Sequence, residues 1–140
     1  FNRGELKQDF VAVLPCQGPG ANGMPELHKL TPYLGLLQNE GYKVALLTDG
    51  RMSGASGKIL AAIQVSPEAL LGGNIGKIID GDLIKIDAEQ GSLEVNAEHD
   101  IATRSTPMPD LEASHSGMGR ELFSAFRAQV GSAESGASIF

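Results

Sequence analysis

The sequence has 140 residues, of which 41% are apolar and 20% charged, and its formal net charge is −6. This length fits one domain with its own core, and the mild acidity argues against nucleic acid as a partner, because phosphate backbones are bound by basic surfaces. The only cysteine, Cys16, cannot form an intrachain disulfide or hold an iron–sulfur cluster alone. No run approaches the roughly 20 apolar residues of a membrane span. The first residue is Phe1 rather than Met, which suggests a fragment.

The first half of the chain alternates apolar runs with turn-forming residues. Two of these runs predict buried strands: 10–14 and 43–48. Between them, residues 18–25 are rich in glycine and proline and predict a loop. A helix is predicted from Met24, and Pro32 interrupts it or begins a second helix that ends near Gly41.

The second half of the chain predicts shorter elements, with strands and helices in mixed order. Further strands are predicted at 61–65, 75–79, 83–87 and 92–95. Helices are predicted after Ser66, at 98–104 and at 119–130, the last with an apolar stripe of Leu122, Phe123, Phe126 and Val130. Because strands outnumber helices, the pattern indicates a small β-rich α/β domain, more barrel-like than doubly wound.

The segment 18–23 formally matches the G-x-G-x-x-G fingerprint of dinucleotide-binding loops. Two prolines restrict its backbone, and no acidic residue ends a second strand about 20 residues later, because the first candidate is Asp49. A tight loop that directs Glu26 toward a ligand is the better interpretation. A surface pair of Glu26 with Lys29 is its structural alternative.

The segment 48–58 begins where a predicted buried strand ends, which is where α/β folds bind ligands. Small residues at 54–57 expose backbone N–H groups, and Lys58 adds a cation, so the segment suits an anion. Ser53 is a candidate reactive hydroxyl. The spacing is not that of a phosphate-binding P-loop, and a flexible Gly/Ser loop is the structural alternative.

Two blocks, 18–32 and 48–69, resemble the dihydroxy-acid dehydratase and 6-phosphogluconate dehydratase family. The segments that look like the phosphogluconate branch of that family are 22–29, 53–58, 80–82 and 119–123. The resemblance covers nearly the whole chain in order. It implies that residues 1–140 are a single C-terminal domain, a swivelling β/β/α barrel with flanking helices.

The resemblance also implies a function. Members of the family are cytoplasmic hydro-lyases, and the phosphogluconate branch dehydrates 6-phospho-D-gluconate in the Entner–Doudoroff pathway. A larger N-terminal domain, absent from this chain, supplies the cysteines of an iron–sulfur cluster, expected to be [4Fe–4S], and the enzyme is expected to be a homodimer. The isolated chain is therefore expected to fold but not to catalyse.

By residue-level match, Glu26 resembles a ligand of a divalent cation such as Mg²⁺, and Ser53 resembles the general base. Lys58, helped by the N–H groups of Gly54 and Ser56, is our own assignment for the substrate's phosphate, with a surface lysine as the alternative. Arg51 either braces the loop or contacts substrate. The proposal requires Glu26 and Ser53 to face one shared cleft.

Two other functions remain open from the sequence. The chain could belong to a dihydroxy-acid or other sugar-acid dehydratase with the same fold. It could also be a non-catalytic module that binds an anion or a partner, which a complete gene product of this length would favour.

Overall fold

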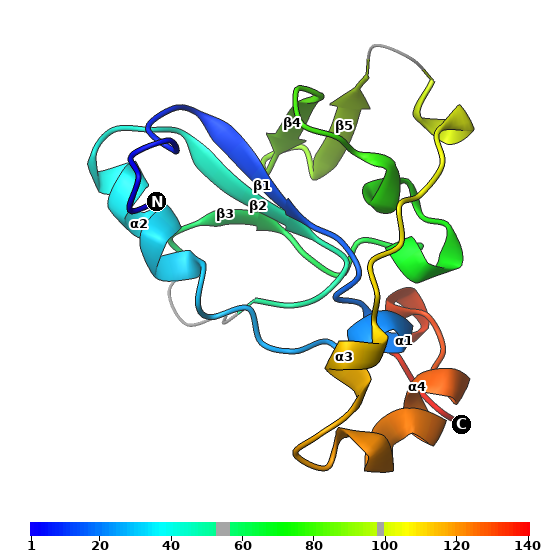
Figure 1. Ribbon diagram of the computed structural model, residues 1–140. Coiled ribbons are helices and arrows are strands. Elements are labelled where there is room, and N and C mark those ends of the chain that lie inside the picture. Colours follow the sequence, from blue (N-terminus) through cyan, green and yellow to red (C-terminus); the bar gives the residue numbers. More distant parts are fainter. Residues whose placement is uncertain (53–56, 98–99) are drawn as a thin grey trace.

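The most apolar runs of the sequence form a small parallel sheet. The computed structural model describes residues 1–52, 57–97 and 100–140. Three strands, in the order β1-β2-β3, form the parallel sheet: β1 (Phe10–Leu14), β2 (Val44–Thr48) and β3 (Leu60–Ala62). Two further strands, β4 (Leu83–Asp87) and β5 (Ser92–Asn96), form a separate antiparallel hairpin (Figure 1).

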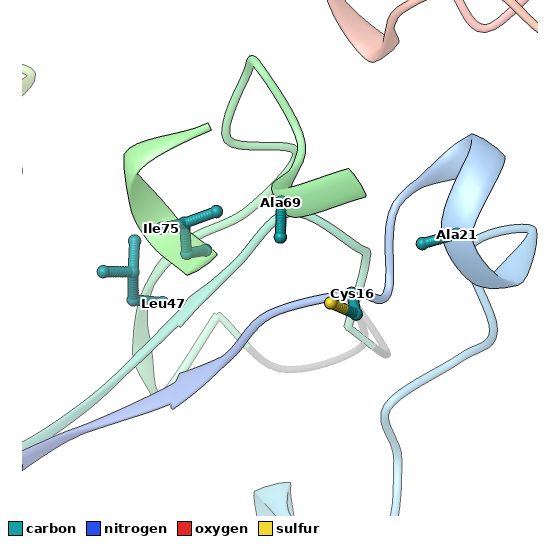
Figure 2. Packing of buried hydrophobic residues seen from close by; sticks show 5 residues of the cluster. All are labelled: Cys16, Ala21, Leu47, Ala69 and Ile75. Atoms are coloured by element: carbon teal, nitrogen blue, oxygen red, sulfur yellow. The ribbon is translucent and has the colours of Figure 1, made fainter. Parts of the chain in front are cut away.

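The central strand β2 is buried along its whole length and divides the core in two. Successive side chains of a strand point to opposite faces of its sheet. Leu47 therefore packs in one cluster with Cys16, Ala21, Ala69 and Ile75 (Figure 2). The second cluster, on the other face, contains Leu34, Leu37, Val44, Leu46 and Ile59.

Short helices cover the sheet and extend beyond its end. The α-helices are α1 (Pro19–Asn22), α2 (Thr31–Asn39), α3 (Glu112–His115) and α4 (Ser124–Gln129). The 3₁₀ helices are η1 (Ala69–Leu71), η2 (Asn74–Lys77), η3 (Ile101–Thr103), η4 (Arg120–Phe123) and η5 (Ala133–Ser135). In Figure 1, α2 lies beside the sheet, whereas α1, α3 and α4 gather past the ends of β1 and β2. None of the helices in the described ranges is long and apolar enough to cross a membrane.

The predicted strands at 10–14, 43–48, 83–87 and 92–95 are confirmed. The predicted strand at 75–79 is wrong, because most of it is the 3₁₀ helix η2. A tight turn precedes it: a Cβ on Gly73 would lie 1.8 Å from the carbonyl oxygen of Pro67. The chain therefore coils here, and Gly76 packs against Ala69 instead of extending into a ladder.

The helix predicted from Met24 is also wrong, because residues 24–30 form no helix. Met24 has a positive φ of 52°, and Glu26 pairs with Arg51 in an isolated parallel bridge. The predicted loop at 18–25 contains α1, and the helix predicted at 119–130 is divided between η4 and α4. Of the helix predicted at 98–104, the described part contains η3.

The expectation of a mixed α/β domain is confirmed, but the described strands do not close into a barrel. Barrel closure requires an unbroken ladder of paired strands. Here the parallel sheet and the hairpin are two separate sheets, and β3 is only three residues long. The β-rich barrel-like form predicted from the sequence is therefore replaced by an open sheet, a hairpin and short helices.

One ion pair joins the hairpin region to the segment after it. Arg104 donates two hydrogen bonds to the Asp82 carboxylate, at 2.5 and 3.0 Å, and the Asp82 side chain is only 4% exposed. Arg104 also donates to the carbonyl of Lys77, whose ammonium donates to the carbonyl of Ala102. The hydrogen bonds from Arg104, and then from the Ile79 backbone N–H, lower the pKa of Asp82 below its ordinary value.

We predict that Asp82→Asn lowers the melting temperature of the chain at neutral pH. A carboxylate whose pKa is lowered by folding stabilises the fold above its unfolded pKa of about 3.9, and loses that effect as the pH falls through the folded value. The difference in melting temperature between wild type and variant should therefore shrink below about pH 4. Asp80→Asn, at the neighbouring exposed turn residue, is the matched control. A difference that does not change with pH would contradict the assignment.

Candidate active site at the carboxyl ends of the strands

A buried carboxylate organises the end of the sheet where β1 and β2 terminate. Asp49 follows β2 directly and has no exposed surface. Its two oxygens accept hydrogen bonds from the backbone N–H groups of Cys16 (3.0 Å), Gln17 (2.8 Å) and Ala69 (2.9 Å). One side chain thus ties together the chain after β1, the chain after β2 and the start of η1.

The neighbouring Thr48 strengthens the same junction. Its hydroxyl donates to the carbonyl of Leu14 at 2.7 Å and accepts from the N–H of Gly50 at 3.0 Å. Gly50 must be small, because a Cβ there would lie 2.7 Å from the carbonyl oxygen of Gln17. The loops that leave β1 and β2 are therefore held close together at their first residues.

A second buried carboxylate, that of Glu68 before η1, contacts the N-terminal end of α1. It is 5% exposed and accepts from the N–H groups of Gly20 (3.0 Å) and Ala21 (3.1 Å), which are unsatisfied donors of the first helical turn. A Cβ on Gly18 would lie 2.3 Å from one oxygen of Glu68. The glycines of the formal fingerprint therefore admit a carboxylate from the same chain at the place where a pyrophosphate would bind.

Cys16 lies inside this junction and faces the core (Figure 2). Burial raises the pKa of its thiol, and the carboxylates of Asp49 and Glu68 raise it further. A metal or cluster ligand must be a thiolate, which these surroundings disfavour. The described residues of this chain therefore do not fit an iron–sulfur cluster.

The C-terminal segment holds α1 from the opposite side. The Nε2 atom of His115, on α3, lies 2.7 Å from the carbonyl oxygen of Ala21. Since a carbonyl only accepts, Nε2 carries the proton and donates. Arg120 adds a contact from its guanidinium to the Asn22 side-chain oxygen at 3.4 Å. Helix α1 is thus held between Glu68 on one side and the C-terminal segment on the other.

Glu26 follows α1 and lies beside the start of the second sequence block. It pairs with Arg51 in the parallel bridge, where the N–H of Leu27 donates to the carbonyl of Arg51 at 3.3 Å. The Arg51 side chain donates from Nε to the carbonyl of Met24 at 2.9 Å. The Glu26 side chain is exposed, and within the described ranges no hydrogen bond or ion pair engages its carboxylate. The predicted surface pair with Lys29 is not formed.

The structure brings Glu26 and Arg51 together, but it does not place every predicted site residue with them. Ser53, Gly54 and Ser56 lie outside the described residues, so the shared cleft of Glu26 and Ser53 stays a prediction. Arg51 precedes Ser53 by only two residues, which is the one described link between the two predicted residues.

Lys58 lies near the opposite end of the parallel sheet, where the strands begin. It precedes β3, whose Leu60 pairs with Ala45 near the start of β2. Its ammonium donates to the side-chain oxygen of Asn39, at the end of α2, at 2.7 Å. The length of β2, roughly 13 Å at 3.3 Å per residue, therefore separates Lys58 from the carboxyl end of the strands, where Arg51 lies. Its role in phosphate binding stays a prediction.

A complete metal site is absent from the described ranges, where no three His, Cys, Asp or Glu side chains converge. Mg²⁺ prefers oxygen ligands and is often held by one or two carboxylates with several waters. The exposed carboxylate of Glu26 fits that role as a single ligand. The rest of such a site would have to come from elsewhere in the enzyme or from substrate.

Asp49 and Glu68 are organising residues that the sequence pattern did not predict. In the sequence, Asp49 stands out only as an acidic residue at the end of the second predicted strand, and Glu68 falls in the helix predicted after Ser66. Their partners lie 20 to 48 residues away in the chain, so local pattern gives no sign of the pairing. The closest available signal is the pair Gly18 and Gly20, which indicates that something approaches the backbone closely.

Comparisons with known proteins give consistent relatives. A family model described as dihydroxy-acid/6-phosphogluconate dehydratase C-terminal matches residues 1–137. A phosphogluconate dehydratase of Rhizobium meliloti is 58% identical over 99% of this chain and 23% of its own length. That of Zymomonas mobilis is 56% identical over 98% of this chain and 22% of its own length. A dihydroxy-acid dehydratase of Wolinella succinogenes is 47% identical over 68% of this chain and 17% of its own length. The chain thus spans less than a quarter of these relatives.

We predict that Gly18→Ala destabilises the chain by roughly 1–3 kcal/mol, because the new methyl group displaces the Glu68 carboxylate from the N–H groups of α1. Gly35→Ala is the matched control, since Gly35 lies within α2 and a Cβ there meets nothing within 4 Å. That change should stabilise by about 0.5–1 kcal/mol. Denaturant unfolding measures both. Equal effects of the two substitutions would show that Glu68 does not occupy the position described.

Proposed function

We infer that this chain, which belongs to the dihydroxy-acid/6-phosphogluconate dehydratase C-terminal family, is the C-terminal domain of a phosphogluconate dehydratase. Such an enzyme converts 6-phospho-D-gluconate to 2-dehydro-3-deoxy-6-phosphogluconate in the Entner–Doudoroff pathway. The observation that carries this proposal is the extent of the match. Phosphogluconate dehydratases align along nearly the whole chain, whereas the dihydroxy-acid dehydratase aligns along two thirds.

The reaction is an elimination. A base removes the proton from C2, the electron pair of that C–H bond forms a double bond to C3, and the C3 hydroxyl leaves with its bonding pair and takes up one proton to become water. The resulting enol then tautomerises to the 2-keto product. We assign the base to Ser53. Because a serine hydroxyl does not ionise at neutral pH in water, it needs positive charge nearby, and Arg51 is the described cation closest to it in the chain.

We assign the chain's contribution to cation binding to Glu26. The bridge with Arg51 fixes the Glu26 backbone, while its carboxylate is exposed and faces no basic partner among the described contacts. When bound, a divalent cation and an iron–sulfur cluster would supply Lewis acidity toward the substrate carboxylate and the departing hydroxyl. Since this chain does not fit the cluster, we assign a [4Fe–4S] cluster to the larger N-terminal part of the enzyme.

The proposal extends to the assembly. The relatives are more than four times as long as this chain, so we expect the site to be complete only when the N-terminal part covers the strand ends. We also propose a cytoplasmic homodimer, as the family resemblance implies. The isolated chain should accordingly show no dehydration of 6-phosphogluconate in a coupled assay for the keto product.

We predict that Ser53→Ala in the full-length enzyme lowers kcat by at least roughly 10²–10⁴-fold, which is the usual contribution of a general base. The cluster absorbance should be unchanged, because the cluster is held elsewhere. Retained turnover in this variant would refute the assignment of the base.

We predict that Glu26→Gln raises the Mg²⁺ concentration that gives half-maximal rate by roughly tenfold or more, since even residues that only support a metal ligand have effects of this size. Glu5→Gln is the matched control, because Glu5 is exposed and pairs only with Arg3 among the described contacts. The same Mg²⁺ dependence in both variants would remove Glu26 from the cation site.

The identity of the substrate is tested separately. The wild-type enzyme should act on 6-phosphogluconate with a far higher kcat/KM than on unphosphorylated gluconate or on a 2,3-dihydroxy acid. A preference for the dihydroxy acid would favour the alternative branch of the family, which the Wolinella succinogenes match keeps open.

A further inference from the structure

A groove of about 460 Å³ lies between the α1 region and the C-terminal segment. One wall is formed by Pro19 and the residues that follow α1, including Met24 and Pro25. The other wall carries aromatic and aliphatic side chains from η4 onward: Phe123, Phe126, Val130 and Ile139. Figure 1 shows the two parts of the chain that build it, with α1 against α4.

The charged groups of this groove all have one sign. Among the described residues that line it, the only charged ones are Arg120 and Arg127, and no acidic residue is present. The ion pairs in the described ranges involve other residues: Arg3 with Glu5, Lys7 with Glu40, and Arg104 with Asp82. Two arginines that have no carboxylate partner among the described residues therefore flank an apolar groove, on a chain whose net charge is −6.

The contacts of these arginines leave most of their donors for a ligand. Arg120 donates from one terminal nitrogen, to the Asn22 side chain and to the carbonyl of Ser114. Arg127 donates from one terminal nitrogen, to the carbonyl of Arg120 at 3.2 Å. Each guanidinium has five N–H groups in a planar fork that matches two oxygens of a phosphate. In the described contacts, the Nε and second terminal nitrogen of each are not engaged.

The groove adjoins the candidate active site. Met24 and Pro25, which line it, directly precede Glu26, and Arg51 donates to the carbonyl of Met24. Three arginines thus contact or flank the segment that carries Glu26. The structure brings the cationic groove and the exposed carboxylate to neighbouring residues of one short stretch of chain.

We propose that Arg120 and Arg127 bind the phosphate end of a phosphorylated sugar acid whose carboxylate end is directed toward Glu26. This inference rests on the proposed function and deepens it. Apolar walls have a low dielectric constant, so the attraction between a guanidinium and a phosphate is stronger beside them than on an open polar surface. Lys58 is the less suitable partner, because its ammonium donates to Asn39 near the opposite end of the parallel sheet.

The test uses the full-length enzyme and compares 6-phosphogluconate with gluconate. Arg127→Gln is the primary variant, because the Arg127 side chain makes a single hydrogen bond, to a backbone carbonyl, among the described contacts. It should lower the ratio of kcat/KM for 6-phosphogluconate over gluconate by at least roughly tenfold, the effect of losing one charge-assisted hydrogen bond. The loss should lie mainly in KM. Arg120→Gln should act likewise, and Arg3→Gln, at an exposed residue of the N-terminal segment, is the matched control.

The outcomes that would contradict the phosphate assignment differ from the outcome that would contradict the proposed function. An active wild type with an unchanged selectivity ratio in both arginine variants overturns the phosphate assignment alone. A larger drop in the selectivity ratio for Lys58→Gln than for either arginine variant also overturns it. An equal loss of kcat/KM on both substrates, together with loss of the dimer or of the cluster, overturns it as well, because it would show that the arginines contact the N-terminal part. A wild-type enzyme inactive on 6-phosphogluconate overturns the proposed function as well.

Discussion

The buried carboxylate of Asp49 is the constraint on which the candidate site depends. Its oxygens take three backbone N–H groups from two segments that are far apart in the sequence. A carboxylate without exposed surface is costly to bury unless its oxygens are satisfied, and three donors meet that requirement. The same bonds fix where the loops after β1 and β2 begin. The candidate site residues at this end of the sheet lie on the two loops that begin there.

Glu68 and His115 extend the order from the strand ends to Glu26. Glu68 satisfies the first N–H groups of α1, and His115 donates to a carbonyl of the same helix. An α-helix of four residues has little stability of its own, because nucleation costs more than so few hydrogen bonds return. Helix α1 is therefore a product of its tertiary contacts. The bridge to Arg51 then sets the course of the next residues, so Glu26 lies on a backbone that is fixed at both ends.

The sequence predicted those parts of the fold whose causes are local. The runs at 10–14 and 43–48 are strands because they are short, apolar and ended by turn residues, and the predicted strands at 83–87 and 92–95 pair as β4 and β5. The helix predicted from Met24 failed because a bridge to Arg51, 25 residues away, outweighs local propensity. The apolar stripe of 119–130 was recognised, but its Phe123 and Phe126 are about half exposed and line a groove rather than a core. Of the site residues, Glu26 was assigned by resemblance, Arg51 was a candidate with two open roles, and their proximity required the fold.

The positive charges near the carboxyl ends of the strands bear on two requirements of the proposed reaction. In the proposed reaction an anionic substrate and the Ser53 hydroxyl both need positive charge, and we propose that Arg51, Arg120 and Arg127 supply it on a chain that is acidic as a whole. Arg51 nevertheless donates its Nε to the Met24 carbonyl rather than to the neighbouring Glu26. The Glu26 carboxylate is thereby left without an ion-pair partner among the described contacts. An exposed, uncompensated carboxylate of this kind is suited to a hard divalent cation, which prefers oxygen ligands. Under the proposed function the arrangement separates the roles: we propose that the arginines bind the anion and that Glu26 binds the metal.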